Sequence, residues 1–181
     1  MKEFYFDVGL DPNHRIAEDA GLLAHDVSMF RLSRFAASCG LRGEADAQTI
    51  KSEAASADKN DGFLIGFSAL RDCYGKVDYF FAPVNVPQFA GIAKVLKAYK
   101  TKTRIIAAVP EGTEHLNEAA AMLADETVHV KQDAADEAAA KLNETEHISI
   151  GPDSSAALCA MKDRALAEQN KHARYVVLFT D

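Results

Sequence analysis

Beyond residue 62, short apolar runs alternate with amphipathic stretches along the chain. The apolar runs predict buried strands at residues 77–82, 104–109, 127–130, 147–150 and 175–179. Apolar side chains at helical spacing predict helices over residues 63–73, 89–99, 114–123, 133–142 and 154–168. Because strand and helix alternate with short links, we predict an α/β fold: a three-layer, mostly parallel sheet with helices on both faces.

The beginning of the chain has a different pattern. Residues 3–8 alternate aromatic and polar side chains, which predicts a short strand, whereas residues 11–57 show helical spacing with breaks at 25–26 and 40–43. Residues 45–57 are rich in alanine and polar side chains, which predicts a surface helix. The sequence therefore predicts a mostly helical segment over residues 1–61 and an α/β domain over residues 62–181.

Composition narrows the class of protein. The 181 residues suit one domain, with or without a small appendage, and 48% of them are hydrophobic. A net charge of −7 argues against a nucleic acid or an anionic membrane surface as partner. The three cysteines lack metal-ligand spacing, and no apolar run is long enough for a signal peptide or a membrane span. We expect a cytoplasmic protein with reduced thiols.

The sequence lacks the motifs that would indicate a particular catalytic activity. The six histidines stand singly, without a second ligand at metal-binding spacing. The sequence contains no nucleophile elbow, no Walker motif and no dinucleotide-binding glycine pattern. These patterns predict neither a metal site nor a catalytic residue.

Three series of segments resemble a known family, both in their order along the chain and in the spacing between them. They are residues 75–82 with 90–97, residues 104–112, and residues 125–130 with 148–158 and 175–181. Together they resemble the large domain of fold-type-II pyridoxal-phosphate enzymes, which include cysteine synthase, cystathionine β-synthase and threonine-deaminase-like enzymes. The resemblance implies that residues 62–181 form part of a cofactor domain, in a family that acts on amino acids.

The loop at residues 84–88 departs from that family, whose glycine-rich loop closes backbone N–H groups around the cofactor phosphate. Here the loop contains no glycine, and Pro87 removes one donor. Val84 and Val86 are β-branched and resist positive φ angles. Asn85 and Gln88 remain as the donors that could contact an anion at the start of the following helix.

The Schiff-base lysine of the family is a second departure. In the family it lies far upstream, followed by a serine-glycine-asparagine loop that grips the substrate, and the chain before residue 62 is too short for both. Lys51 is the only lysine between Lys2 and Lys59, and its polar helical context is typical of a solvated side chain. The resemblance therefore supplies no catalytic lysine.

The segment around residue 153 matches the position where the family contacts the pyridine nitrogen. Depending on the alignment, the matching residue is Asp153 or Ser154, with Ser155 next to them. Asp153 would favour the protonated ring and a serine would not. The simpler interpretation is that Asp153 or Ser154 caps the following helix, which we favour.

Three hypotheses follow. The first is a non-catalytic relative without cofactor, which binds a small molecule or a protein partner and could dimerise through an exposed apolar face. The second is a fragment or subunit of a pyridoxal-phosphate lyase or transferase, which binds the cofactor only when another chain supplies the lysine. The third is an unrelated α/β protein with its site at the strand ends, at Asn85, Gln88, Glu111 and Asp153.

Overall fold

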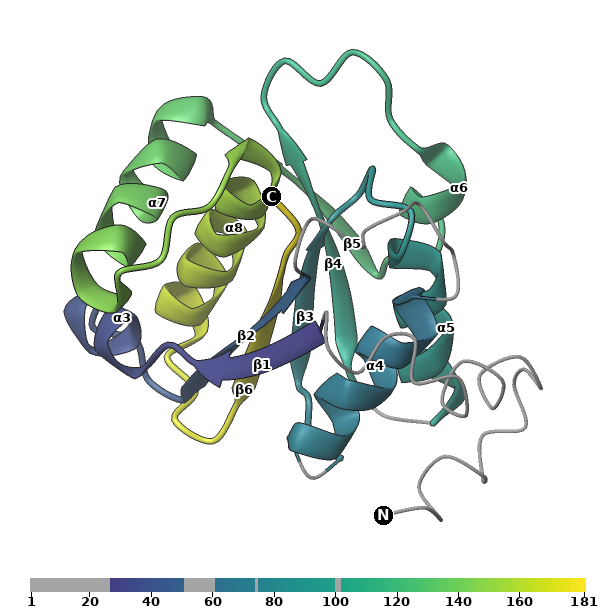
Figure 1. Cartoon of the computed structure of the whole chain (residues 1–181), viewed down its shortest axis with the longest axis horizontal. Coiled ribbons are helices and arrows are strands. Elements are labelled where there is room, and N and C mark those ends of the chain that lie inside the picture. Colours follow the sequence, from purple (N-terminus) through teal and green to yellow (C-terminus); the bar gives the residue numbers. More distant parts are fainter. Residues whose placement is uncertain (1–26, 51–60, 74, 100–101) are drawn as a thin grey trace.

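The computed structural model describes residues 27–50, 61–73, 75–99 and 102–181. They form a six-stranded sheet in the order β1-β2-β6-β3-β4-β5 (Figure 1). Its strands are β1 (Val27–Arg31), β2 (Glu44–Ile50), β3 (Tyr79–Pro83), β4 (Arg104–Pro110), β5 (Glu126–Val130) and β6 (Arg174–Phe179). The described strands pair in parallel, apart from β1, which runs antiparallel to β2 at one edge.

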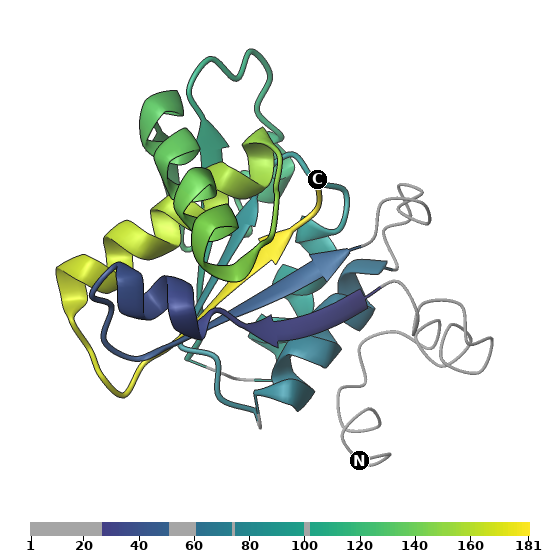
Figure 2. The same ribbon diagram turned by 60° about the vertical axis from the view of Figure 1, so that its left-hand side comes forward.

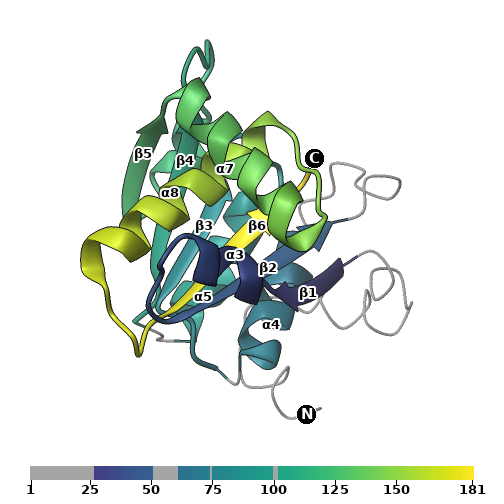
Figure 3. The same ribbon diagram turned by 90° about the vertical axis from the view of Figure 1, so that its left-hand side faces the viewer.

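Helices cover both faces of the sheet, as Figures 1 and 3 show. One face carries α3 (Ser33–Ser38), α7 (Gln132–Glu146) and α8 (Pro152–Glu168). The other face carries α4 (Asp61–Asp72), α5 (Phe89–Ala98) and the short α6 (Glu118–Ala121). The predicted three-layer α/β fold with a mostly parallel sheet is confirmed.

The central strands are apolar on both sides because both sides are covered. Phe80 and Phe81 are adjacent and fully buried, yet Phe80 packs with α4 and α5 whereas Phe81 packs with α7 and α8. Val176 and Val177 on β6 divide between the two cores in the same way. This arrangement explains why these strands are continuous apolar runs rather than alternating ones.

Helices α4 and α5 approach each other closely through glycine. A Cβ atom at Gly66 would lie 2.9 Å from the Cβ of Val95, and one at Gly62 would lie 2.1 Å from the carbonyl oxygen of Gln88. A side chain at either position would separate the helices. The first turn of α4 therefore packs directly against the start of α5.

The surface helix predicted over residues 45–57 is wrong for its described part, because residues 44–50 form β2. Alanine favours helices in isolation, but here β2 lies between β1 and β6, where Ala45 and Ala47 are buried against α3 and α8. β1 and β2 thus share one sheet with the strands beyond residue 62, and the predicted division at residue 61 stays a prediction. The elements predicted over residues 3–8 and 11–26 lie outside the described residues.

Two further predicted elements differ from the structure. Residues 147–150 form no strand: α7 ends at Glu146, His147 is its C-cap with φ 61°, and the following residues lead into α8 at Pro152. The helix predicted over residues 114–123 shortens to α6, which Asn117 caps by accepting a hydrogen bond from the N–H of Ala120 at 3.1 Å. In the part of the chain that the structure describes, no helix is both long enough and apolar enough to cross a membrane.

Candidate functional site

The candidate site residues lie at the end of the sheet that is formed by the C-terminal ends of its parallel strands. The end of β6 meets the start of α8, and β3, its neighbour in the sheet, leads into α5 on the opposite face. Figure 2 shows the end of β6, marked C, beside the turn that leads from α7 into α8. Ligands of open α/β folds bind at the C-terminal ends of the strands, between two neighbouring strands whose adjoining helices lie on opposite faces of the sheet.

The start of α8 is closed by the side chain of Asp181. Its carboxylate accepts hydrogen bonds from the backbone N–H of Asp153 at 3.2 Å and of Ser154 at 3.0 Å, and from the Ser154 hydroxyl. The backbone carbonyl of Asp181 also accepts a bond from the N–H of Gly151 at 3.2 Å. A helix start leaves its first N–H groups without partners and favours negative charge, and Asp181 meets both requirements.

The two serines at this helix start are engaged within the protein. Ser154 is fully buried, and its hydroxyl oxygen also accepts a bond from the N–H of Thr180 at 2.9 Å. The Ser155 hydroxyl donates to the carbonyl of Pro152 at 2.9 Å. Neither hydroxyl is open toward a ligand ring in this arrangement.

The predicted capping of α8 by Asp153 or Ser154 is wrong. The N-cap residue is Gly151, whose position has no side-chain cap, and the capping carboxylate comes from the end of β6. A Cβ atom at Gly151 would lie 2.3 Å from Oδ2 of Asp181, so glycine at this position makes room for the carboxylate. The start of α8 thus accommodates the side chain of Asp181.

Asp153 adds a second carboxyl group at the same helix end. Burial raises the pKa of Asp153 above its usual range, and the nearby charge of Asp181 raises it further. Two acidic groups at one helix start make the position unfavourable for an additional anion.

The turn between β3 and α5 is filled by its own side chains. Val84 and Val86 are 1% and 8% exposed and belong to the core beneath α4 and α5. Gln88 occupies the N-cap position of α5 without a side-chain cap bond and is 3% exposed. Gly62 is packed against its carbonyl oxygen. The start of α5 is therefore covered by α4.

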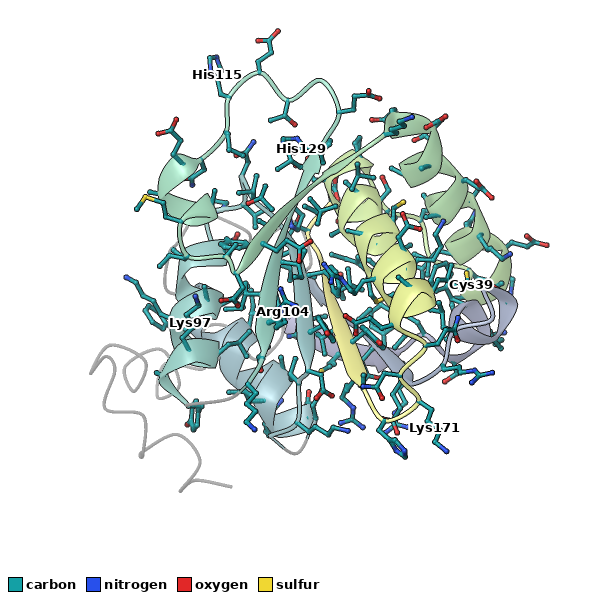
Figure 4. The ribbon with its side chains drawn as sticks, turned by 180° about the vertical axis from the view of Figure 1, so that it is seen from behind. Cys39, Lys97, Arg104, His115, His129 and Lys171 are labelled. Atoms are coloured by element: carbon teal, nitrogen blue, oxygen red, sulfur yellow. The ribbon has the colours of Figure 1, made fainter. Side chains whose placement is uncertain are left out.

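Asn85 holds a neighbouring loop in place. Its side-chain amide donates to the carbonyl of His115 at 3.0 Å, and its side-chain oxygen accepts from the N–H of Asn117 at 2.9 Å. These two bonds fix the loop between β4 and α6, at the top of which Figure 4 labels His115. Asn85, predicted as an anion donor, has an observed role in positioning this loop.

These residues do not fit the phosphate of pyridoxal phosphate in the way the resembled family holds it. A phosphate cradle requires several backbone N–H groups free to converge on one point. At the turn of residues 84–88, which matches the family's phosphate loop, the side chains of Val84 and Val86 fill the space. At the start of α8, the other helix start at this end of the sheet, Asp181 already accepts from the first N–H groups. The described residues also contain no group of three or more metal-binding side chains.

A pocket lies beyond this turn, at the ends of β4 and β5. Its volume is about 430 Å³, and its lining combines an acidic side chain, two basic side chains and aliphatic walls. The lining residues are Val109, Pro110, Glu111, Gly112, Thr113, Leu116, His129, Val130 and Lys131. Of these only Glu111 was a candidate from the sequence, because His129 and Lys131 belong to a different segment and no local pattern connects the two.

A separate polar cluster is buried beneath α4, on β2 and β6. The carboxylate of Asp46 lies 3.5 Å from Nε of Arg174, 3.9 Å from Nε of Arg31 and 3.7 Å from Sγ of Cys73. Burial raises the pKa of Asp46, and burial together with the Asp46 charge raises the pKa of Cys73 to about 12. A thiol with such a pKa stays protonated at neutral pH, so Cys73 is not an activated nucleophile.

Comparison with known proteins finds similarity at the level of the fold. No protein-family model matches the sequence, and no curated protein matches it. Among solved structures, the chain is similar to a hydrogen sulfide-producing enzyme from Fusobacterium nucleatum, with a TM-score of 0.63 and 22% sequence identity. The similarity covers 71% of this chain and 50% of the enzyme, so the chain spans about half of that enzyme's length. At this identity the likeness supports the α/β fold and transfers no residue role.

Proposed function

We propose that this chain is a non-catalytic relative of cysteine-synthase-like pyridoxal-phosphate enzymes. In this proposal it keeps part of their cofactor domain as a scaffold and binds a small molecule or a protein partner without the cofactor. The segments that resemble the family support the relationship. The fold shared with a hydrogen sulfide-producing enzyme is in keeping with it.

The observation that carries the proposal is the carboxylate of Asp181 on the backbone N–H groups of α8. A phosphate that used this helix start in place of the turn at residues 84–88 would have to displace this carboxylate and would remain close to Asp153. A divalent anion near two carboxyl groups is repelled, and its N–H donors are already used. The chain alone therefore has no favourable place for the cofactor at this helix start.

The pocket at the ends of β4 and β5 is the place where we expect a small molecule to bind. This pocket lies at the C-terminal ends of the strands and combines aliphatic walls with charged groups, as ligand sites do. Glu111, His129 and Lys131 provide both acceptors and donors, and the structure holds none of the three in an ion pair among the described residues. These side chains are available to a ligand.

A titration with pyridoxal phosphate tests the non-catalytic proposal. An internal aldimine absorbs visible light, and borohydride reduction fixes it to its lysine for mass spectrometry. We expect only slow, non-saturable labelling spread over exposed lysines such as Lys94 and Lys131. Saturable, stoichiometric labelling of one lysine would overturn the proposal.

A second candidate function rests on the length comparison. Since the chain spans half of the hydrogen sulfide-producing enzyme, a second chain could supply the remaining part of such a fold, together with the Schiff-base lysine of the resembled family. In that case the cofactor would bind only to the complex. Purification of the tagged chain from its natural source tests this idea: a stoichiometric partner carrying a reducible aldimine would support it. A chain recovered alone, or with a partner that carries no aldimine, would contradict it.

A further inference from the structure

The pocket at the ends of β4 and β5 has one wall that is not part of the sheet. Val109 and His129 line it from the strands, whereas Leu116 lines it from the loop between β4 and α6. Figure 4 shows His115 at the top of this loop, with His129 of β5 below it. Val109 lines the pocket and is only 3% exposed. A movement of the loop would therefore change access to the pocket.

The loop is fixed at both of its ends. At its start, the N–H and the hydroxyl of Thr113 donate to the carbonyl of Pro110, at 3.2 Å and 2.7 Å. Gly112 forms this turn with φ 84°, which glycine adopts without strain. At the other end, the side chain of Asn117 caps α6. Only residues 114–116 lie between these two fixed points.

One side chain holds these three residues in place. Residues 114–116 are exposed, and among the described residues the hydrogen bond that reaches them comes from Asn85. Its amide donates to the carbonyl of His115 at 3.0 Å, and its oxygen accepts from the N–H of Asn117 at 2.9 Å. These two backbone groups lie on either side of Leu116. Asn85 thus fixes the residue that forms the loop wall of the pocket.

The base of this contact is rigid, whereas the contact itself can break. Val84 and Val86, on either side of Asn85, are buried in the core beneath α4 and α5. The N–H of Val84 also donates to the carbonyl of Ala108 at 3.1 Å. Asn85 itself is exposed, so water competes for both of its hydrogen bonds. These bonds can break and release residues 114–116 while the sheet stays intact.

We propose that residues 114–116 form a gate to the pocket and that the Asn85 side chain is the latch that closes it. This proposal rests on the proposed function, which places a ligand in the pocket. The ligand enters and leaves while both bonds to Asn85 are broken. Two exposed hydrogen bonds are weak in net terms, so the open state is populated about 1–10% of the time. The turn that matches the phosphate loop of the resembled family thus anchors a gate instead.

Thiol labelling at position 109 measures the opening of the gate without a ligand. In a Cys39→Ser background, Val109→Cys places a thiol behind the gate, and the remaining native cysteines are buried. A bulky thiol reagent should label position 109 roughly tenfold faster when Asn85→Ala is added, because both latch bonds are lost. Asn85→Asp keeps the acceptor for the N–H of Asn117 and should give an intermediate rate.

Two controls separate a gate from a general loss of stability. Asn143→Ala makes the same change on the exposed side of α7 and should leave the rate at position 109 unchanged. Cys73 is buried beneath α4 and should stay unlabelled in every variant. An unchanged rate in Asn85→Ala, or labelling of Cys73 that accelerates together with position 109, would overturn the proposal.

Hydrogen exchange tests the latch in the unmodified chain. The N–H of Asn117, which is bonded to Asn85, should exchange roughly a hundredfold faster than the N–H of Val84, which is bonded to the neighbouring strand β4. Equal protection of the two groups would show that the loop opens only together with the sheet, and it would also overturn the proposal. Neither experiment uses a ligand or a cofactor. Saturable labelling of one lysine by pyridoxal phosphate would therefore refute the proposed function and leave the result on the gate standing.

Discussion

Replacement of Asp181 by alanine is the most informative perturbation of the α8 start. The change removes a carboxylate that accepts from two backbone N–H groups of α8 and from the Ser154 hydroxyl. Loss of a helix cap costs about 1 kcal/mol, and a buried donor left without an acceptor costs about 1–3 kcal/mol. Because the Ser154 hydroxyl is fully buried, both costs apply.

The two contributions are partly offset. Removing the charge of Asp181 relieves its repulsion of Asp153, and the Ser154 hydroxyl can turn toward another acceptor. We therefore expect Asp181→Ala to lower the free energy of unfolding by about 2 kcal/mol. For a chain of this size that corresponds to a fall in Tm of roughly 4–8 °C.

Urea unfolding followed by circular dichroism measures this loss. Asp163→Ala is the matched control, because Asp163 lies on the same helix with a side chain that is 65% exposed, and its removal should cost less than about 0.5 kcal/mol. Asp181→Asn keeps one acceptor oxygen and should fall between wild type and Asp181→Ala. If Asp181→Ala unfolds at the same urea concentration as wild type with an unchanged m-value, the capping role of Asp181 is refuted.

Three further predictions concern buried polar groups. Among the described residues, both amide atoms of the fully buried Gln48 lack a hydrogen-bond partner, so Gln48→Met should raise the free energy of unfolding by about 1 kcal/mol; a loss of stability in chemical denaturation would show that the amide is bonded. The pKa of Asp153 is raised in the folded state, so the folded chain holds this proton more tightly than the unfolded chain, and stability should fall as the pH rises from 3.8 through the raised value. Asp153→Asn should remove that fall and be the more stable protein at neutral pH, whereas an unchanged pH profile of unfolding would contradict the environment assigned to Asp153. Because the pKa of Cys73 is about 12, a thiol reagent at pH 8 should modify the half-buried Cys39 first and Cys73 only after unfolding; rapid modification of Cys73 in the native protein would show that it is accessible as a thiolate.

The parallel core of the fold could be predicted because its strands are buried on both faces. The continuous apolar runs at residues 104–109 and 175–179 can hardly belong to anything but buried strands or helices, and their short length favours strands. β2 was missed because its alanine-rich and polar composition favours an exposed helix, although Glu44, Asp46 and Gln48 alternate with alanine at the period of a strand. Its burial arises from pairing with β1 and β6, which no local pattern reveals.

The sequence predicts the position of several candidate residues at the C-terminal ends of the parallel strands, but it does not predict their hydrogen-bond partners. Asn85 lies after a parallel strand, as expected from its position after an apolar run. Asp153 and Ser154 lie at the same end of the sheet for a different reason: the strand predicted before them is absent, and the start of α8 lies beside the end of β6. The capping residue, Asp181, binds backbone groups 28 positions earlier in the chain, and only the fold brings them together. An acidic residue directly after an apolar strand, with a helix start at the same edge, is the signal that could have suggested this contact.

The proposed relationship predicts a protein that retains an enzyme scaffold without the enzyme's anion site. Tight contacts within the chain replace the groups that would receive a phosphate: valine side chains at the turn of residues 84–88, and the Asp181 carboxylate at α8. The proposed function therefore places ligand binding in the pocket lined by His129 and Lys131.

A crystal structure determined after soaking with pyridoxal phosphate tests this account most directly. We predict that the carboxylate of Asp181 stays on the N–H groups of Asp153 and Ser154, and that no phosphate density appears at the turn of residues 84–88. A phosphate bound in that turn, or at the start of α8 with Asp181 displaced, would contradict the account.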